Sequence, residues 1–244
     1  MMKRFFVIAL FVLGLGQLYA QPVRDTAWTK AGYFGLKLTQ VSLSSWSAGG
    51  ESALAFDSQI TYSADFKRDR QLWQNRLELG YGLTKNDGKS ARKTNDKIYF
   101  ASTYGYQIYK TLYWSALLNF NTQFAKGYDY NIEDSDFISK FMAPGYLMIG
   151  TGVTWSPNKI FTATFTPASW RGTIVADSRL ADEGAFGVDK GKHLLSEFGA
   201  NLKAEVNYEF LPNMKVYSRL ELYSNYLEDP ERGCSLGGTI KYGD

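Results

Sequence analysis

The sequence is poor in the residues that carry most metal and redox chemistry. It contains one cysteine, Cys234, and one histidine, His193. A single cysteine excludes an internal disulfide and a cysteine-based metal site. The histidine stands beside Lys192 without a Gly-x-Ser-x-Gly turn, so a Ser-His hydrolase has little support. We therefore expect no catalytic activity and no cofactor.

Acidic residues cluster at one place, where Glu133, Asp134 and Asp136 lie close together in the sequence. Paired carboxylates perform glycoside hydrolysis, and carboxylate oxygens bind calcium. The spacing does not match an EF-hand loop, so we expect no metal site. We interpret the segment as a polar loop with a short helical turn over Ser135–Met142, capped by Asp134.

Long apolar runs are absent after the first residues. Lys3 and Arg4 precede an apolar run over Phe5–Leu15 and then Ala20, which predicts a secretory signal peptide over residues 1–20. No later run reaches the roughly 18 residues that a membrane helix needs. No Pro- or Ser-rich linker divides residues 21–244, so we predict one domain that does not cross a membrane with helices.

Charge of one sign is also lacking. The chain has 27 Lys and Arg against 24 Asp and Glu, a formal net charge of +3. Because the signs are evenly mixed, we expect no nucleic-acid partner. One loop is basic, with residues that would contact acidic lipopolysaccharide headgroups or simply keep a mobile loop in solution: Lys85, Lys89, Arg92, Lys93 and Lys97.

Aromatic residues and alternating patterns are abundant. Aromatic residues reach 16%, with seventeen tyrosines, and they favour strands and bilayer interfaces. Apolar residues recur at a period of two through most of the chain, while helical spacing is hard to find. The alternation predicts nine strands and a weak tenth, at about 33–44, 51–65, 71–84, 97–109, 112–125, 145–156, 159–167, 195–210, 214–227 and 235–242.

The predicted connections alternate between short and long. Bacterial outer-membrane barrels have short periplasmic turns and longer outer loops, whereas a soluble sandwich gives no reason for this regularity. We therefore predict an all-β fold, an antiparallel up-and-down transmembrane β-barrel in the outer membrane of a Gram-negative cell. A soluble secreted β-sandwich that binds a ligand is the competing fold.

The turn at Pro212 sets a register that matches opposite charges across the hairpin. Each cross-strand pair contributes roughly 0.2 to 1 kcal/mol. We interpret this charged face as the lumen wall, where the pairs either stabilise the barrel or line an ion path. The other face is uncharged over seven rungs and suits lipid. The pairs are Glu209 with Lys215, Glu205 with Arg219, and Lys203 with Glu221.

Tryptophans lie near the predicted strand ends, where an apolar ring with one polar N–H suits the membrane interface. Trp46 and Trp170 fall on the side of the long loops, and Trp73, Trp114 and Trp155 on the side of the short turns. The alternative is that they fill a soluble core. Gly49 and Gly50 follow Trp46, and we expect them to take the positive φ of a hairpin turn.

Two stretches carry a resemblance to a known family. The segments "LTQVSLSSWSAGGESALAF" (38–56) and "LADEGAFGVDKG" (180–191) are similar to an uncharacterised outer-membrane β-barrel family of Bacteroidota, a domain of unknown function. The first segment matches the family motif at Gln40, Trp46, Gly49, Gly50 and Ser52, with Ser45 and Glu51 where Asn is usual. The resemblance implies location and architecture, but no activity.

The resemblance also implies about twelve strands and a terminal aromatic residue. After "YSNYLEDPE" this chain reads "RGCSLGGTIKYGD". We therefore expect nine to ten of the strands here, without the closing strands of the family.

The function expected from these observations is a structural or accessory role in the envelope. The expected partners are outer-membrane lipid and, at the long loops, other envelope proteins. The alternatives are a narrow passive channel and a soluble binding protein. Inward-facing Tyr99, Tyr113, Tyr217 and Tyr223 would narrow such a channel.

Overall fold

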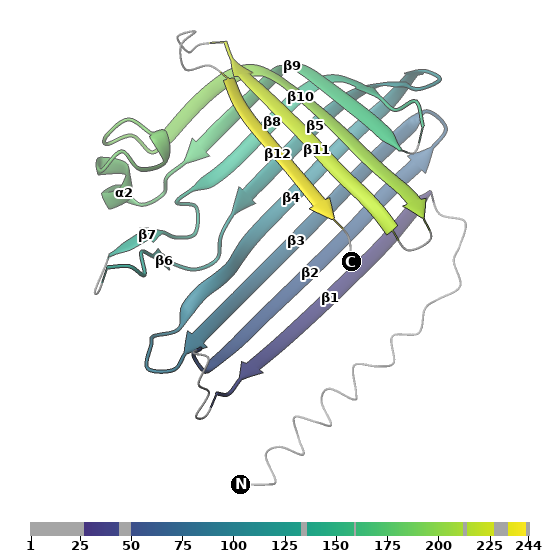
Figure 1. The fold of residues 1–244 in the computed structure, drawn as a ribbon. Helices are drawn as coiled ribbons and strands as arrows, with labels where there is room; N and C mark the ends of the chain where they lie inside the picture. Colours follow the sequence, from purple (N-terminus) through teal and green to yellow (C-terminus); the bar gives the residue numbers. More distant parts are fainter. Residues whose placement is uncertain are drawn as a thin grey trace.

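One large antiparallel sheet of ten strands, joined in sequence order, forms the body of the protein (Figure 1). The computed structural model describes residues 27–43, 50–132, 136–158, 160–211, 214–226 and 234–242. The predicted signal peptide lies outside this part of the chain. The strands are β1 (Trp28–Val41), β2 (Ala53–Arg68), β3 (Gln71–Asn86), β4 (Arg92–Tyr109), β5 (Leu112–Thr122), β8 (Gly145–Trp155), β9 (Phe161–Ile174), β10 (Leu194–Leu211), β11 (Met214–Asn225) and β12 (Cys234–Tyr242).

The prediction of an all-β fold is confirmed, and most strand positions agree within a few residues. The main difference is β9, which was expected to end at residue 167 but continues to Ile174. Its pairing with β8 shifts register between Thr151 and Val153, opposite Pro167. A bulge at this point accommodates the proline, because the extra residue need not donate to the ladder.

The connections alternate in length as the sequence predicts. Two-residue turns join β2 to β3 at Asp69 and β4 to β5 at Lys110, while residues 123–144 and 175–193 form long connections. Because neighbouring strands are antiparallel, all the short turns lie at one end of the sheet and all the long connections at the other. We call these the turn end and the loop end.

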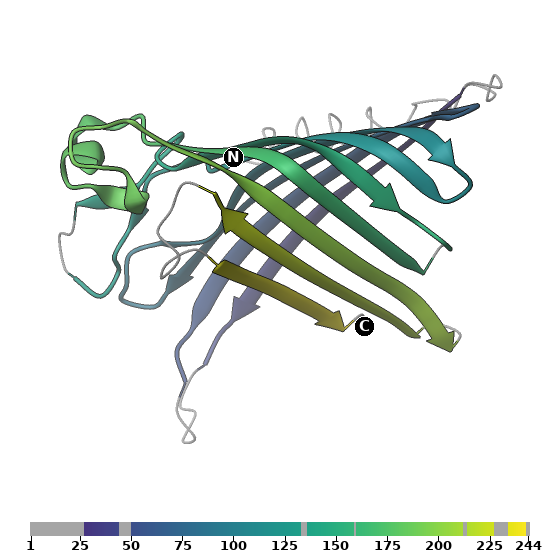
Figure 2. The same ribbon diagram turned by 90° about the horizontal axis from the view of Figure 1, so that it is seen from above.

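The sheet is strongly twisted and curled, but it is not closed (Figure 2). Hydrogen-bonded order runs from β1 to β12, and these two edge strands do not pair with each other. Register shifts also occur near Gly82 and Gly199. Such bulges increase local twist and bend the strand.

Alternation divides the side chains of the sheet between two faces. One face carries rows of apolar residues, such as Phe34, Ile60, Leu79 and Ile98, which oppose one another across β1 to β4. The other carries Glu78, Asn119 and most of the charged residues.

Among the described residues, no helix has the length and apolar character that a membrane-spanning helix requires.

The most deeply buried apolar cluster lies in the loop-end connections. We call the described parts of residues 123–144 and 175–193 the cap. The cap contains β6 (Gly127–Tyr128), β7 (Phe137–Ser139), α2 (Ser178–Asp182) and the short 3-10 turn η1 (Ala185–Gly187). Its core consists of Ala143, Val175, Leu180, Ala181 and Val188.

The prediction of a helical turn over Ser135–Met142 is wrong, since its described residues form β7 and an isolated bridge between Lys140 and Ala143.

Candidate functional site

The polar face of the sheet carries the charged residues of the predicted β10–β11 ladder. Of the predicted pairs, Glu205–Arg219 is formed, whereas Lys203 contacts Glu205 instead of Glu221. The register is the predicted one from Lys203–Glu221 to Glu209–Lys215. It differs at the turn, where Leu211 rather than Phe210 opposes Met214, because a register shift lies between Glu209 and Leu211.

Glu205 lies between two cations on this face. Its Oε1 accepts a hydrogen bond from Arg219 Nε at 2.9 Å, and its Oε2 lies 3.0 Å from Lys203 Nζ. Glu221 Oε1 accepts a hydrogen bond from the buried Asn201. The side chain of Lys215 lies outside the described part of the structure. The paired charges hold the side chains of β10 and β11 in place.

A second charge network lies on the same face, in β3 and β4. The carboxylate of Glu78 lies 2.5 Å from both Arg76 Nε and Lys97 Nζ. Lys97 Nζ also lies 5.0 Å from the centre of the Tyr99 ring. Cations on this face are therefore matched by carboxylates on the same or a neighbouring strand and by aromatic rings.

Small residues allow close packing in the middle of the polar face. Ser115, Thr166, Ser169 and Asn201 are at most 2% exposed. Gly152 lies so close to β9 that a Cβ built on it would be 2.0 Å from the carbonyl oxygen of Phe165. Only glycine fits that approach without moving the backbone.

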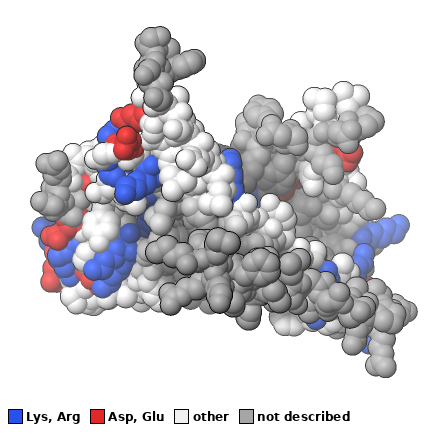
Figure 3. All heavy atoms as spheres, turned by 90° about the horizontal axis from the view of Figure 1, so that it is seen from below, with Lys and Arg blue, Asp and Glu red and all other residues white. Residues whose placement is uncertain are grey.

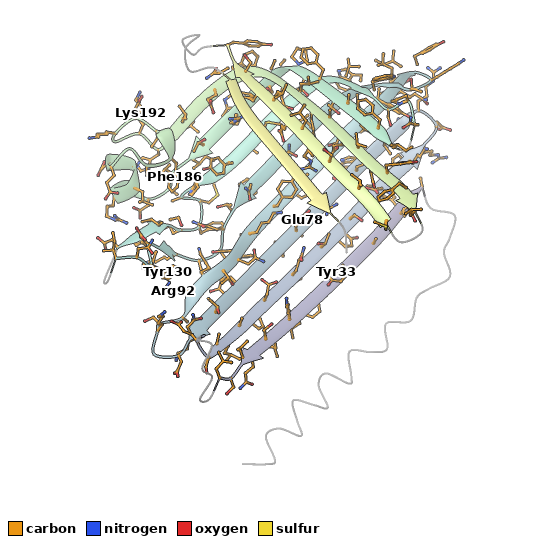
Figure 4. All side chains as sticks on the ribbon, viewed as in Figure 1. Tyr33, Glu78, Arg92, Tyr130, Phe186 and Lys192 are labelled. Carbon is orange, nitrogen blue, oxygen red and sulfur yellow. The ribbon has the colours of Figure 1, made fainter. Side chains whose placement is uncertain are left out.

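A cavity of about 510 Å³ opens on the polar face, in the half nearer the loop end. Tyr99 of β4 and Glu221 of β11 both line it, although four strands lie between β4 and β11 in the sheet. The sheet therefore curls around its polar face, and the apolar face lies on the outside. The cavity also receives Phe186 from the cap, which Figure 4 places at the loop end.

Polar and cation–π contacts hold the two connections of the cap together. Asp177 accepts a hydrogen bond from the Leu180 N–H at the start of α2 and pairs with Lys140. The ion pair with Lys140 and that hydrogen bond hold the pKa of Asp177 below its usual value. Three cations lie over the ring of Phe137 at 4.5 to 5.7 Å: Lys126, Lys140 and Arg179.

Charged side chains of both signs gather at the end of the molecule that carries the cap (Figure 3). The basic residues that were expected in one loop lie partly in the connection between β3 and β4 and partly in these two strands. Lys93 lies in β4 and pairs with Asp96 at 2.7 Å, while Lys89 pairs with Glu51. The hydrogen bond from Lys89 lowers the pKa of Glu51. Lys93 therefore belongs to a strand rather than to the loop, and both lysines are paired with carboxylates.

Arg92 also has a partner in the cap. Its guanidinium carbon lies 5.4 Å from the centre of the Tyr130 ring, and both residues are labelled in Figure 4. Within the described residues, the basic segment thus takes part in folded contacts.

The tryptophans lie on the apolar face near the strand ends. Trp73, Trp114 and Trp155 lie close to the turn end, and Trp170 lies within β9 near the loop end. The indole N–H groups of Trp73 and Trp170 donate to Ser102 and Ser196 at 2.9 and 2.7 Å. The polar N–H groups of both indoles are therefore hydrogen-bonded, although the rings lie on the apolar face.

The motif residues of the first connection are partly described. Gln40 opposes Leu54 in the β1–β2 pairing, and Gly50 has a φ of 132°, as expected for a glycine in this connection. Ser52 Oγ accepts a hydrogen bond from Leu43 N. Trp46 and Gly49 lie outside the described residues.

Two of the residues considered for catalysis, His193 and Asp136, lie in the described part of the chain. His193 is exposed, and its Nδ1 lies 2.7 Å from the carbonyl oxygen of Val175. Asp136 is also exposed, while Glu133 and Asp134 lie outside the described part of the chain. No group of metal-binding side chains occurs among the described residues.

A family model described as "Protein of unknown function (DUF3078)" matches residues 38–128. This match runs from the end of β1 through β6 and fits the expected resemblance to an uncharacterised domain family. No curated protein and no solved structure matches the chain.

Sequence reasoning missed several residues that line the cavity. Arg171 lay beyond the predicted end of β9, and Phe186 lies in a connection without a predicted element. Asn119 and Asn121 lie in the predicted strand at about 112–125, which gave no sign of a ligand site. Their alternation with Leu118 and Phe120 places both amides on one face, but the curl of the sheet was needed to bring them opposite Glu221.

Proposed function

We propose that this chain forms the wall of an outer-membrane β-barrel and has a structural or accessory role in the envelope. The apolar outer face would contact lipid, and the polar inner face would surround water. The observation that carries the proposal is the exposure of large apolar side chains over the whole outer face, opposite an inner face of matched charges.

The exposure of this face is high in the edge strand β1 and also in β2, inside the sheet. Phe34 is 65% exposed, Leu38 70% and Ile60 42%. Soluble monomers rarely expose contiguous apolar patches of more than a few hundred Å². Lipid makes the same surface favourable, because hydrocarbon does not exclude apolar side chains as water does.

Strand length and the positions of the aromatic residues also support a membrane location. The strands of the large sheet contain at least 9 residues, and β4 and β10 contain 18. A tilted transmembrane strand needs about 9 to 11. Aromatic rings cluster at both ends of the apolar face, with Trp28 near Phe66 at the turn end and Phe198 near Tyr226 at the loop end.

A soluble β-sandwich is less compatible with this architecture. Its apolar face would be covered by a second sheet packed about 10 Å away. The other sheet in the described part of the chain is the ribbon of β6 and β7, with strands of two and three residues. That ribbon lies in the cap and leaves the outer face of the large sheet uncovered.

The inner face favours a structural role over an open channel. Glu205 and Glu78 each contact two cations, so their charges are largely compensated within the wall. The cap adds folded residues at the loop end. Other envelope proteins would contact this end, where the longest connections lie.

Cysteine labelling tests the proposal at two adjacent residues on opposite faces. In a Cys234→Ser background, Leu202→Cys and Lys203→Cys are each refolded into phosphatidylcholine vesicles. A maleimide dissolved in the bilayer is compared with a charged, water-soluble maleimide. We expect the lipid reagent to modify position 202 and the water-soluble reagent to modify position 203.

The reverse pattern would refute the proposal. So would reaction of both positions with the water-soluble reagent on protein recovered without detergent, which is the outcome that a soluble sheet predicts.

A further inference from the structure

We propose that the cavity on the polar face binds an uncharged, polyhydroxylated ligand, that is, one or more sugar units of a neutral glycan. The inference builds on the proposed function, because this face is the one turned away from lipid.

The size and position of the cavity are those of a ligand site. Its volume of about 510 Å³ lies within the range of roughly 300 to 1,000 Å³ typical of small-molecule pockets. Six strands of the large sheet contribute to its wall, together with Phe186 of the cap. A rigid sheet and a folded cap thus define its shape.

The charges that line the cavity balance one another. Arg171 and Arg219 contribute two positive charges, and Glu197 and Glu221 contribute two negative ones. Arg171 Nη1 lies 3.8 Å from Glu197 Oε2, and Arg219 is bound to Glu205. An anion would meet two carboxylates and a cation two guanidinium groups, so the wall favours a ligand without net charge.

Several hydrogen-bonding groups on the wall have no protein partner among the described residues. These are the side-chain amides of Asn119 and Asn121 and the hydroxyls of Tyr99, Tyr146 and Thr173. An amide carries both donors and an acceptor, and a hydroxyl acts as either. Sugar hydroxyls have the same dual character, so they satisfy such a surface without adding charge.

Apolar side chains also line the cavity, and they suit the C–H surface of a sugar ring. The ring of Phe186 enters from the cap, and Met148 and Leu195 lie on the strands. A sugar ring has an apolar C–H surface between its hydroxyl edges. A wall that combines aromatic and aliphatic groups with amides therefore suits a pyranose better than it suits an ion or a purely apolar molecule.

The test uses the full chain refolded in detergent micelles. Isothermal titration calorimetry measures binding of neutral di- and trisaccharides in gluco, galacto and manno configurations. The anionic probe is trigalacturonate and the cationic probe is the trimer of glucosamine. We expect saturable binding of at least one neutral saccharide, and at least tenfold weaker binding of both charged probes.

A matched set of variants locates the site. The double variant Asn119→Leu/Asn121→Leu removes two amides at nearly constant volume and should weaken binding at least tenfold. Asn207→Leu makes the same change on the polar face outside the cavity and should alter the affinity less than twofold. Tyr146→Phe removes a single hydroxyl and provides a second measurement if the double variant fails to fold.

Three results would overturn the inference. They are the absence of saturable binding across the neutral panel, tighter binding of a charged probe, and equal losses in the cavity variants and Asn207→Leu. If binding is absent while the labelling pattern at positions 202 and 203 remains as expected, the inference fails alone. If the labelling pattern reverses, the proposed function itself fails.

Discussion

The guanidinium carbon of Arg171 lies 3.7 Å from the centre of the Tyr223 ring. Arg171 belongs to β9 and Tyr223 to β11, so the contact bridges two strands separated by β10 on the concave face. Tyr223 is only 4% exposed, and the same arginine lies 3.8 Å from Glu197. The contact therefore links β9 to β11 beside the cavity.

Replacement of Arg171 by Gln should lower the free energy of unfolding by about 1 to 2 kcal/mol, because a desolvated cation–π contact contributes on that order. Arg171→Lys should fall between the wild type and Arg171→Gln, since it keeps the charge and loses the planar stacking. Urea titration followed by tryptophan fluorescence measures the change. Arg68→Gln, at the exposed end of β2, is the control and should have little effect.

Arginine substitutions at two adjacent positions on β2 test whether the outer face contacts lipid or water. Ile60→Arg should impair folding into vesicles by about 2 to 4 kcal/mol if the side chain reaches the middle of the bilayer. Thr61→Arg places the same residue on the inner face at the same depth and should fold nearly as well as the wild type. Heat-dependent gel mobility reports the folded fraction, and similar mobility shifts in both variants would contradict the prediction.

Gly152 and Gly105, on neighbouring parts of the sheet, should differ sharply in how well they tolerate replacement by alanine. Gly152→Ala places a Cβ 2.0 Å from the carbonyl oxygen of Phe165, whereas the nearest atoms at Gly105 are 3.7 Å away. We expect Gly152→Ala to lower the free energy of unfolding by about 1 to 3 kcal/mol through backbone displacement. Gly105→Ala should be neutral or slightly stabilising. Urea unfolding of both variants checks this, and equal midpoints would show that β8 and β9 can separate without cost.

The cap should open at acid pH. The pKa of Asp177 is lowered in the folded protein, first by Lys140 and then by the Leu180 N–H. The ionised carboxylate therefore stabilises the cap above the ordinary pKa of Asp, about 3.9, and the contribution is lost as the pH falls through the folded-state value. Hydrogen exchange over residues 178–188, corrected for intrinsic rates, should increase in that range.

Substitutions at Asp177 separate its two interactions. Asp177→Asn keeps an acceptor for the Leu180 N–H but cannot ionise, so its cap should lose the pH dependence. Asp177→Ala removes the helix cap as well, which costs about 0.5 to 2 kcal/mol. A pH dependence that persists in Asp177→Asn would assign the titration to another group.

The local features of the fold were predictable from the sequence because they follow from short-range patterns. Alternation located the strands, and the two-residue turns at Asp69 and Lys110 fixed the neighbouring registers. The turn at Pro212 predicted the pairing of Glu205 with Arg219. The structure departs from the predicted ladder at Lys203, which contacts Glu205 instead of Glu221, and beyond Glu209, where a bulge shifts the register without any local pattern that marks it.

The end of β9 was missed for a related reason. Pro167 reads as a strand terminus, because proline cannot donate to a ladder. The strand nevertheless continues through a bulge, and this extension brings Arg171 beneath the cap. The cap itself was also missed, since Val175 and Leu180 have no periodic pattern and are buried only against residues of another connection.

The sequence alone determined which side chains share a face, because side-chain direction alternates strictly along a strand. It also determined that strands joined by short turns are neighbours, since such turns leave them no other arrangement. Only the tertiary structure decided that the polar face is concave and that Tyr99 and Glu221 line one cavity. Curvature accumulates from twist and bulges over many strands, so no single segment of the sequence specifies it.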